Sequence, residues 1–368
     1  MIIKHGKRSG VVDIPSSKSI SHRIIIASLL SGVEVKDELV RGWSDDLKAT
    51  RDCLRAILGG KEHEWHCKES GTTLRLLEPI AGVLGASGNF ICEGRLGSRP
   101  RMPFEKKSVY ELPGDISSQF VSGLLLALPL ASWDSEIKLT TPLQSQAYVK
   151  LTEDAISMSK IRFSKSPDGM SWKIPGSQKY KLEIPPHCCV EGDWSQAAFF
   201  LAMNAHDDGA TGGIVVRGLN MCSIQGDRAV LELLDKSEVD ASQVPDLVPA
   251  LAAHVAGQPG KRVAFYNCER LRLKECDRLE ATKEMVEAIG GQAEIDDSGT
   301  NLLVYGKKLH SGKIKTFGDH RIAMAAAVLA TWSPEDVEID DASVVSKSYP
   351  EFWNDFNKLS VEGAEQHD

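Results

Sequence analysis

Short polar motifs that run directly into apolar stretches are the main pattern of this chain. The stretches have apolar positions three and four residues apart, which indicates helices, and several of them end at glycine. The stretch 45–58, for example, follows Ser44, which suits an N-cap, and places Leu47, Leu54 and Leu58 on one face. The predicted helices are 19–30, 45–58, 72–84, 118–128, 194–205, 226–234, 247–256, 278–289 and 321–330.

Short runs typical of strands lie between the later helices, at 213–216, 262–266 and 301–305. Alternation of strands and helices predicts an α/β protein. The helices recur roughly every 30 to 50 residues, which fits repeated supersecondary units. A chain of 368 residues is longer than one hydrophobic core usually supports, so two domains are expected.

Composition and charge narrow the class of protein. Apolar residues make up 42% and charged residues 26%, as in an ordinary soluble enzyme. A net charge of −8 argues against a general nucleic-acid binder, which usually presents a basic face to phosphates. Eight cysteines form no CxxC pair, so reduced thiols are expected. No run approaches ~18 apolar residues, and a cytoplasmic protein is expected.

The polar motifs concentrate Lys, Arg, Ser and Asp at helix starts. A helix start offers unpaired N–H groups and a partial positive charge, so it attracts anions. Several such starts with basic side chains predict a site for small polyanionic molecules. The motifs are Lys18 to Arg23, Gly71 to Arg75, Ser117 to Gln119, Lys274 to Arg278 and Asp319 to Arg321.

Each motif taken alone has an ordinary structural interpretation. The motif that begins at Lys18 could be a solvated basic helix start, and Gly71 could mark a simple tight turn. Asp246 precedes an apolar helix, where an aspartate is more often an N-cap than a catalytic group. The motif at Lys274 could be a salt-bridged surface helix. Only the ordered set of motifs is specific.

That ordered set resembles the EPSP synthase family, the 3-phosphoshikimate 1-carboxyvinyltransferases, from about Pro15 to Pro350. The resemblance implies an α/β fold that is a two-lobed inverse α/β barrel built from repeated βαβαββ units. Residues 14–190 would form the lobe with most shikimate 3-phosphate contacts. Residues 1–13 and 191–368 would form the lobe with most contacts to the phosphoenolpyruvate carboxylate. Segments 60–70 and 101–117 are shorter than the family usually has, so the first lobe is expected to be trimmed.

The resemblance also implies the reaction. The family transfers the enolpyruvyl group of phosphoenolpyruvate to the 5-hydroxyl of shikimate 3-phosphate and releases phosphate, a step of the shikimate pathway of aromatic amino acid biosynthesis. It uses no metal and no other cofactor, and a monomer without nucleic-acid or membrane partners is expected. Asp246 would accept the hydroxyl proton. Glu275 and Lys18 are both candidates for the acid that protonates phosphoenolpyruvate.

The remaining site residues are carried over from the family motifs. The sequence departs from the family pattern at Glu69, where asparagine is usual, and at Gln146 and Ala147, where a basic residue and proline are usual. Predicted contacts to shikimate 3-phosphate are Lys18, Ser19, Arg23, Ser117, Ser118, Gln119, Ser145, Tyr148, Asp246 and Lys274. Predicted contacts to phosphoenolpyruvate are Lys18, Gly71, Arg95, Gln119, Arg278, Arg321 and Lys347.

Two alternatives stay open at this point. UDP-N-acetylglucosamine enolpyruvyl transferase shares the fold and phosphoenolpyruvate, but the cysteine expected in its catalytic loop is absent between Gly94 and Pro100. A relative that binds anionic ligands without catalysis is the other alternative, suggested by the trimmed lobe and by Glu69. Retention of Asp246 and Glu275 argues against it.

Overall fold

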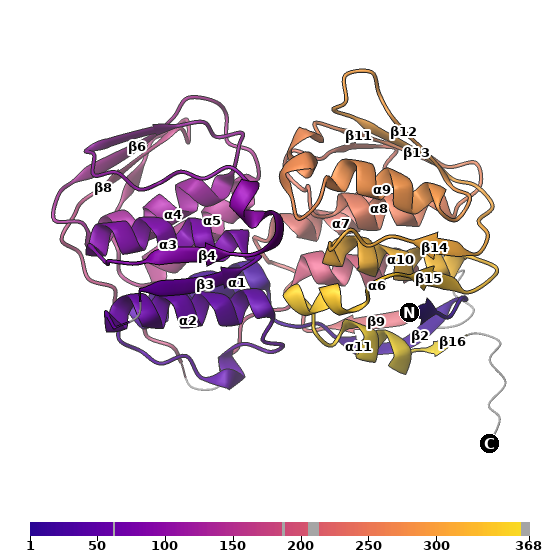
Figure 1. Cartoon of the computed structure of the whole chain (residues 1–368), viewed down its shortest axis with the longest axis horizontal. Helices are drawn as coiled ribbons and strands as arrows, with labels where there is room; N and C mark the ends of the chain where they lie inside the picture. The colour runs from indigo at the N-terminus through magenta and orange to yellow at the C-terminus, as the bar shows by residue number, and fades with distance from the viewer. Residues whose placement is uncertain (62, 186–187, 205–212, 362–368) are drawn as a thin grey trace. The chain divides into compact units, whose positions relative to one another are not determined.

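The computed structural model describes the chain except for residue 62 and residues 186–187, 205–212 and 362–368. The chain forms two compact units (Figure 1). Residues 1–15, 191–223 and 227–368 form one, called the terminal unit below. Residues 16–190 and 224–226 form the other, the inserted unit. The inserted unit is thus made mainly from one continuous segment that interrupts the terminal unit.

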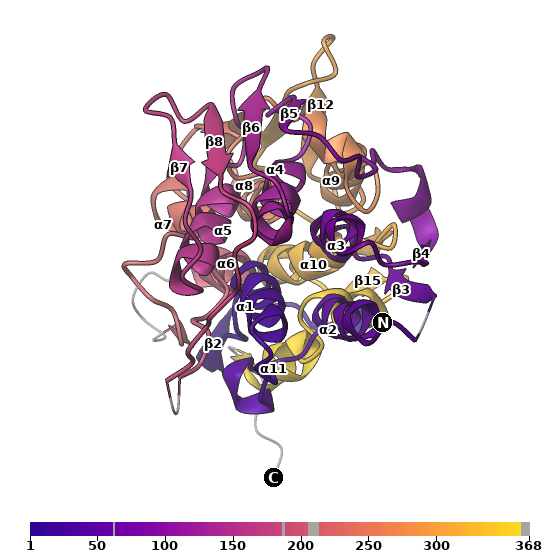
Figure 2. The same cartoon turned by 90° about the vertical axis from the view of Figure 1, so that its left-hand side faces the viewer.

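Among its described residues, the inserted unit packs five helices against two sheets. In Figure 2 the sheet β5-β6-β8-β7 lies above α4 and α5, and the pair β3-β4 lies beside α2 and α3. Strands β3 and β4 are parallel, as are β5 and β6, whereas β8 is antiparallel to β6 and to β7. The elements are α1 (Lys18–Leu30), α2 (Asp45–Gly59), β3 (Glu64–Lys68), α3 (Gly71–Leu84), β4 (Asn89–Cys92), β5 (Val109–Leu112), α4 (Ser118–Ala127), β6 (Ser135–Leu139), α5 (Gln146–Met158), β7 (Ser164–Lys165) and β8 (Ser171–Ile174).

The terminal unit contains three sheets, with strand orders β1-β15-β14, β10-β11-β13-β12 and β16-β2-β9. Helices α8 and α10 are covered by apolar side chains on all sides, as expected for helices inside a core. The elements are β1 (Ile2–Ile3), β2 (Arg8–Asp13), α6 (Trp194–Asn204), β9 (Ile214–Arg217), α7 (Val230–Leu233), β10 (Glu238–Asp240), α8 (Val248–Ala256), β11 (Arg262–Tyr266), α9 (Arg278–Glu287), β12 (Gln292–Ile295), β13 (Leu302–Tyr305), β14 (Gly312–Ile314), α10 (His320–Trp332), β15 (Val337–Ile339), α11 (Phe352–Lys358) and β16 (Ser360–Val361).

One order of elements occurs in both units. In the inserted unit β5, α4, β6, α5, β7 and β8 follow one another, and in the terminal unit β10, α8, β11, α9, β12 and β13 do the same. Each set is a βαβαββ unit whose first two strands are parallel and whose last two form an antiparallel hairpin. The α/β class predicted from the alternation of elements is therefore confirmed. The sheet of β3 and β4 has only two strands among the described residues.

Helices α3 and α4 of the inserted unit approach each other closely at a glycine. Pro79 lies inside α3 and has no N–H, so the carbonyl of Arg75 loses its usual helical donor. Gly123 of α4 lies against this same carbonyl, and a Cβ on Gly123 would also meet Pro79 Cγ at 3.2 Å. The proline and the glycine together allow the N-terminal ends of the two helices to lie side by side.

Several local predictions need correction. Leu58 was expected on the buried face of its helix but is 45% exposed, in the last turn of α2, which ends at Gly59. Ser44 stands at the N-cap position of α2, yet its side chain makes no capping bond. The segment predicted as a helix from 226 begins with a 3-10 turn and becomes α-helical only in α7. Helices α5 and α11 were not predicted.

The other predicted helices are present, with ends shifted by one or two residues. Residue 205, at the end of the helix predicted over 194–205, lies outside the described residues. Across the part of the chain that the structure describes, no helix is long and apolar enough to cross a bilayer.

Gly123→Ala is expected to destabilise the protein by about 1 to 3 kcal/mol, because the added methyl group would overlap the Arg75 carbonyl of α3. Gly59→Ala is the matched control, since a Cβ at this helical glycine meets nothing within 4 Å. That variant should be neutral or slightly more stable. Urea denaturation of both variants provides the measurement, and equal midpoints would contradict the predicted close approach.

Candidate active site

Lys18 is held at the start of α1 by a buried carboxylate. Its Nζ donates to Asp46 Oδ2 at 2.8 Å, and the Asp46 side chain is only 7% exposed. The preceding residue, Ser17, is buried and donates to Gln225 Oε1 at 2.8 Å. The ammonium group therefore has a fixed position at a helix N-terminus, where an anion would be attracted both by the charge and by the helix dipole.

Arg23 lies one turn further along α1 and is almost completely buried. Its Nε donates to Thr152 Oγ1 at 2.7 Å, and its Nη1 donates to the carbonyl of Ser19 at 2.6 Å. Its Nη2 donates to the carbonyl of Tyr148 at 2.7 Å and to Ser122 Oγ at 3.3 Å. Burial lowers the pKa of Arg23 to about 10, which leaves the side chain charged at neutral pH. Arg23 thus joins α1 to α4 and α5 and gives this surface a permanent positive charge.

A chain of buried polar side chains joins the starts of the first three helices. His22 Nδ1 lies 2.7 Å from Thr50 Oγ1 of α2, and Thr50 Oγ1 lies 2.7 Å from Thr73 Oγ1 of α3. Thr73 then donates to Ser70 Oγ at 2.8 Å, and Ser70 caps α3 by accepting from the Thr73 N–H. Burial lowers the pKa of His22 to about 3, so this imidazole is neutral. These bonds fix α1, α2 and α3 relative to one another.

Two guanidinium groups lie beside Gly71 at the start of α3. A Cβ placed on Gly71 would lie 3.0 Å from Arg75 Nη1 and 3.1 Å from Arg99 Nη1. The glycine therefore leaves room for cations close to the helix N-terminus. Arg95, the residue predicted from the sequence to contact a phosphate, is exposed on the 3-10 turn Gly94–Ser98. The structure places Arg99 beside Gly71, and the role of Arg95 stays a prediction.

The two departures from the family pattern lie in different places. Glu69 precedes the α3 cap, and its side chain lies directly against Gly94. Ser145 is buried and adopts a left-handed conformation with φ of 53°, immediately before Gln146 begins α5. Tyr148 contributes its backbone carbonyl to Arg23. The contacts predicted for the Ser145 hydroxyl and the Tyr148 side chain stay predictions.

The start of α4 presents Gln119 to the start of α3. Ser117 caps α4 by accepting from the N–H of Gln119, and Ser118 is buried. Gln119 Oε1 accepts from Arg75 Nη1 at 2.8 Å, and Gln119 Nε2 donates to Thr72 Oγ1 at 2.8 Å. Gln119 of α4 is therefore in direct contact with Thr72 and Arg75 of the motif that begins at Gly71.

Asp246 of the terminal unit is the centre of a cluster of cations. Its Oδ1 accepts from Lys274 Nζ at 3.1 Å and from Arg278 Nη1 at 2.8 Å, and its Oδ2 accepts from Arg321 Nη2 at 2.9 Å. The following helix α8 begins only at Val248, with Leu247 at the N-cap position. Asp246 is therefore an ion-pair partner, and the interpretation as an N-cap is wrong.

Arg278 is held by three carboxylates. Besides Asp246, it donates to Glu275 Oε2 at 2.5 Å, to Asp319 Oδ2 at 2.7 Å and to Asp319 Oδ1 at 3.2 Å. Asp319 is completely buried, and its Oδ1 also caps α10. Helix α9 begins at Arg278, as predicted, so Lys274 and Glu275 precede it. The side chain of Asp277 caps this start by accepting from the N–H of Glu280.

The charges in this cluster shift one another's proton affinities. Burial alone would raise the pKa of Asp246, but the positive charges of Arg321, Lys274 and Arg278 lower it well below its usual range. Burial lowers the pKa of Lys274 to about 8, although Asp246 acts against this shift. For Arg278, burial is outweighed by the charge of Asp319 and the other carboxylates, which raise its pKa well above the ordinary value. Asp246 and Arg278 are thus charged throughout the neutral range, and Lys274 titrates near its edge.

The remaining predicted residues lie on α10 and near the C-terminus. Arg321 also donates through Nη2 to Ser195 Oγ at 3.1 Å, which joins α10 to the start of α6. His320 is buried beside Asp319, with 3.8 Å between Nδ1 and Oδ1. Lys347 is buried at the end of the 3-10 turn Ser343–Lys347.

Four residues that position the site were missed as candidates. Asp46 and Asp319 each hold a predicted cation, Arg75 holds Gln119, and Ser195 contacts Arg321. The sequence offered a signal for Asp319, which stands within the motif Asp319 to Arg321, whereas Asp46 lies in the first turn of a predicted helix, 28 positions from Lys18. Arg75 stands within a recognised motif, but its partner Gln119 lies 44 positions away, and no local pattern indicates that pairing.

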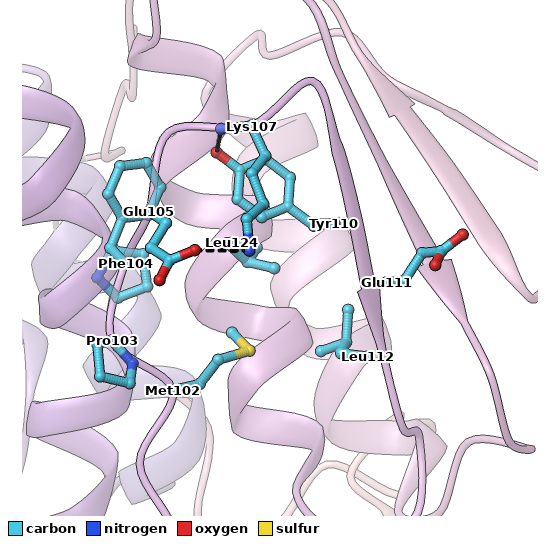
Figure 3. Close-up of a pocket in the computed structure, with 10 residues that line it drawn as sticks. Met102, Pro103, Phe104, Glu105, Lys107, Tyr110, Glu111, Leu112 and Leu124 are labelled. Atoms are coloured by element: carbon cyan, nitrogen blue, oxygen red, sulfur yellow. Dashed lines mark hydrogen bonds and ion pairs between the residues drawn. The ribbon is translucent and has the colours of Figure 1, made fainter.

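The chemistry that these residues offer is the binding of anions and the transfer of protons. Within the described ranges, no group of three or more His, Cys, Asp or Glu side chains is arranged to hold a metal ion. A pocket of about 100 Å³ beside α3 and α4 is lined mainly by apolar side chains, among them Met102, Phe104, Tyr110 and Leu124 (Figure 3). None of the predicted site residues lines it, so this pocket is not the candidate active site.

Comparison with known proteins agrees with this chemistry. A family model described as EPSP synthase (3-phosphoshikimate 1-carboxyvinyltransferase) matches residues 101–243 and 233–356. The chain is 37% identical to the 3-phosphoshikimate 1-carboxyvinyltransferase of Clostridium kluyveri, over 97% of this chain and 96% of the relative. The chain belongs to the EPSP synthase family. The enzyme of the same name from Clostridium perfringens is 35% identical, over 98% of each chain.

Solved structures of EPSP synthases share the fold. The EPSP synthase of Acinetobacter baumannii matches with a TM-score of 0.72 and 19% identity, over 98% of each chain. The enolpyruvyl transferase NikO of Streptomyces tendae matches with a TM-score of 0.64 and 14% identity, over 98% of this chain and 97% of that one. The family and the transferase class predicted from the motifs are confirmed by the full-length relatives. The alignment of this EPSP synthase homologue with the Clostridium kluyveri enzyme runs over 426 positions, which is more than the 368 residues of this chain.

Asp319→Asn is expected to destabilise this EPSP synthase homologue by about 3 to 5 kcal/mol, because it leaves the buried Arg278 without its completely buried carboxylate partner. Asp336→Asn is the matched control, since Asp336 pairs with Lys4, whose side chain is 74% exposed. An exposed pair contributes under about 1 kcal/mol. Denaturant unfolding compares the two variants, and an equal loss of stability would show that the Arg278 pair is not the structural centre described above.

Proposed function

We propose that this chain transfers the enolpyruvyl group of phosphoenolpyruvate to the 5-hydroxyl of shikimate 3-phosphate, giving 5-enolpyruvylshikimate 3-phosphate and phosphate. Full-length relatives at 32 to 37% identity carry the name of this activity. One arrangement in the structure carries the chemistry: the Asp246 carboxylate, ionised and surrounded by Lys274, Arg278 and Arg321. A base among cations suits a reaction in which an anionic substrate loses a hydroxyl proton.

The charges of the proposed substrates match the residues available. Each substrate carries one carboxylate and one phosphate, and a phosphate monoester has a charge of about −1.5 to −2 near pH 7. Together they bring close to six negative charges. Seven cations are proposed to receive them, although the whole chain carries a net charge of −8. They are Lys18, Arg23, Arg95, Lys274, Arg278, Arg321 and Lys347.

Within this function the two units have different proposed roles. The inserted unit supplies most contacts to shikimate 3-phosphate, through Lys18, Arg23 and the polar start of α4. The terminal unit supplies most contacts to the phosphoenolpyruvate carboxylate, through Arg278, Arg321 and Lys347. We further propose that the chain is a cytoplasmic monomer, and that its sheets form the two-lobed inverse α/β barrel of the family with a trimmed first lobe. The two-stranded sheet of β3 and β4 supports the trimming.

The proposed mechanism follows from competition for the cations around Asp246. Without substrates, Lys274, Arg278 and Arg321 hold the Asp246 pKa low, so the carboxylate is a weak base. Substrate phosphate and carboxylate groups would take hydrogen bonds from the same cations. Their neutralising charge would weaken the cations' hold on Asp246 and raise its pKa. Substrate binding would thereby strengthen the base that removes the proton from the 5-hydroxyl.

The proton that reaches C3 of phosphoenolpyruvate has two proposed donors. Lys18 carries an ammonium group held by Asp46, and Glu275 accepts a hydrogen bond from Arg278. In this structure Glu275 accepts and Lys18 donates, so Lys18 is the better placed as a proton donor. Addition of the 5-hydroxyl to C2 gives a tetrahedral intermediate with a methyl group at C3. Loss of one proton from that methyl group together with expulsion of phosphate restores the double bond and completes the reaction without a metal or another cofactor.

Phosphate release is the direct test of the function. The purified protein is expected to release phosphate from phosphoenolpyruvate only when shikimate 3-phosphate is present. UDP-N-acetylglucosamine serves as the comparison acceptor, and release with that nucleotide sugar alone would reassign the chain to the sister enzyme. Asp246→Asn should reduce the rate by at least about 100-fold, because it removes the proposed base. Binding of both substrates without any phosphate release would indicate a catalytically inactive relative.

Shikimate 3-phosphate is expected to bind more weakly above about pH 8. Burial lowers the pKa of Lys274 to about 8 in the unliganded protein, so this side chain is positive below that pH and neutral above it. A bound phosphate favours the positive form, so binding takes up a proton at higher pH, and the dissociation constant should rise by up to about tenfold per pH unit. Calorimetric titrations between pH 7 and 9.5 measure this slope.

Two variants test whether Lys274 causes this pH dependence of the dissociation constant. Lys274→Met should bind weakly at every pH and lose the added dependence above pH 8, because no proton remains to be taken up at this position. Lys283→Met is the control, since Lys283 pairs with Glu287 on the exposed face of α9. It should keep the slope of the unmodified protein. An unchanged slope in Lys274→Met would contradict the assignment to Lys274.

A further inference from the structure

We propose that Arg75 is a positioning residue that fixes Gln119 as a hydrogen-bond donor towards an anionic substrate. This inference rests on the proposed function and deepens it, because it assigns a role to a residue outside the predicted substrate contacts. Arg75 lies in α3, is only 5% exposed and has Gln119 as its side-chain partner. All residues of the argument belong to the inserted unit.

Arg75 is itself held rigidly. Its Nε and Nη2 donate to the carbonyl of Pro100 at 3.4 and 3.2 Å, and its guanidinium lies over the ring of Phe120, 5.5 Å from the centroid. These contacts on two sides orient the remaining nitrogen, Nη1, towards Gln119. The close approach of α3 and α4 at Gly123 keeps the partners within reach. An arginine with this many contacts presents a donor in one fixed direction.

The chemistry of a guanidinium determines which end of the Gln119 amide faces it. Arginine has donors only, so the atom opposite Nη1 must be the amide oxygen. A flipped amide would set NH₂ against the guanidinium, two donors facing each other. The amide nitrogen is therefore directed to Thr72 Oγ1 at 2.8 Å. The orientation of Gln119 thus follows from its neighbours and does not depend on how the amide atoms were assigned.

This orientation leaves donors available at the start of α3. Gln119 Nε2 carries two hydrogens and uses one for Thr72, and the Thr72 hydroxyl accepts that bond, so its own hydrogen can point elsewhere. Thr72 follows Gly71 directly, and Gln119 of α4 contacts Thr72. Arg75 and Arg99 add positive charge beside Gly71. Donors, cations and a helix N-terminus together suit a phosphate or carboxylate oxygen. Arg75 therefore acts through Gln119 to present N–H and O–H groups to an anion.

Steady-state kinetics of single and double variants test this role. Arg75→Met is expected to raise the KM of at least one of the two substrates by about tenfold, the loss expected for one hydrogen bond to a charged group, with a smaller change in kcat. In a Gln119→Ala background, Arg75→Met should have little further effect on that KM. Arg101→Met is the control, because the exposed Arg101 pairs with Glu78 of the same helix and not with Gln119. That variant should keep both KM values.

A second pair of variants works even where Arg75→Met fails to fold. Gln119→Glu keeps an acceptor for Arg75 but removes the N–H donors, so it should raise the same KM at least as much as Gln119→Met. A Gln119→Glu enzyme with unchanged KM would overturn the proposal, since Gln119 would then serve as an acceptor. Equally, multiplicative effects of Arg75→Met and Gln119→Ala would overturn it, because Arg75 would act independently of Gln119.

The activity of the unmodified protein tests the proposed function separately from the positioning role of Arg75. Phosphate release that requires both substrates must first be seen with the full chain, and its absence would refute the function itself. Where that activity is present and Arg75→Met is folded with unchanged KM values, the function stands and the positioning role of Arg75 is refuted. Thermal unfolding of each variant, measured in parallel, distinguishes a loss of folded protein from a change in KM.

Discussion

The buried ion-pair cluster around Asp246 and Arg278 is the interaction on which the terminal unit depends. Removing several charges from water is costly, and only close opposite charges offset that cost. Asp319 is completely buried and caps α10 while it holds Arg278, so the same carboxylate fixes a helix start and a cation of the site. A change at Asp319 would therefore affect both the start of α10 and the placement of Arg278. The same pairs fix Lys274, Arg278 and Arg321 around one carboxylate, which concentrates positive charge in this part of the unit.

The inserted unit also fixes its helices relative to one another, but it does so mainly with neutral hydrogen bonds. Its helix starts are joined by neutral groups, from His22 through Thr50 and Thr73 to Ser70. Each member of this chain is buried and bonded to the next, as a buried polar network requires. Neutral hydrogen bonds do not compete for an anion, so a ligand beside Gly71 would not disrupt this framework. At Lys18 and at Asp246, by contrast, a ligand would compete with an existing ion pair.

The sequence predicted most of the helices, but it did not predict which side chains pair between them. Helix starts such as those of α1, α3 and α4 could be predicted because caps, glycines and apolar spacing are local signals. Asp246 looked like an N-cap by the same local reasoning, yet its partners Arg278 and Arg321 lie 32 and 75 positions away. Long-range pairing is decided by the packing of α8, α9 and α10, which no short pattern records. The discontinuous terminal unit could be expected only from the resemblance to a family.

If the inserted unit is trimmed as proposed, its proposed site residues still lie on helices that are present. Among the described residues the sheet of β3 and β4 has two strands, and Trp65 packs edge-to-face against Phe90 of the neighbouring strand, with ring centroids 4.8 Å apart. Strand β3 leads directly into Ser70 and Gly71, so its main task is to place the start of α3. Loss of strands beside this sheet should therefore reduce the stability of the unit more than it changes the binding of anions at its helix starts.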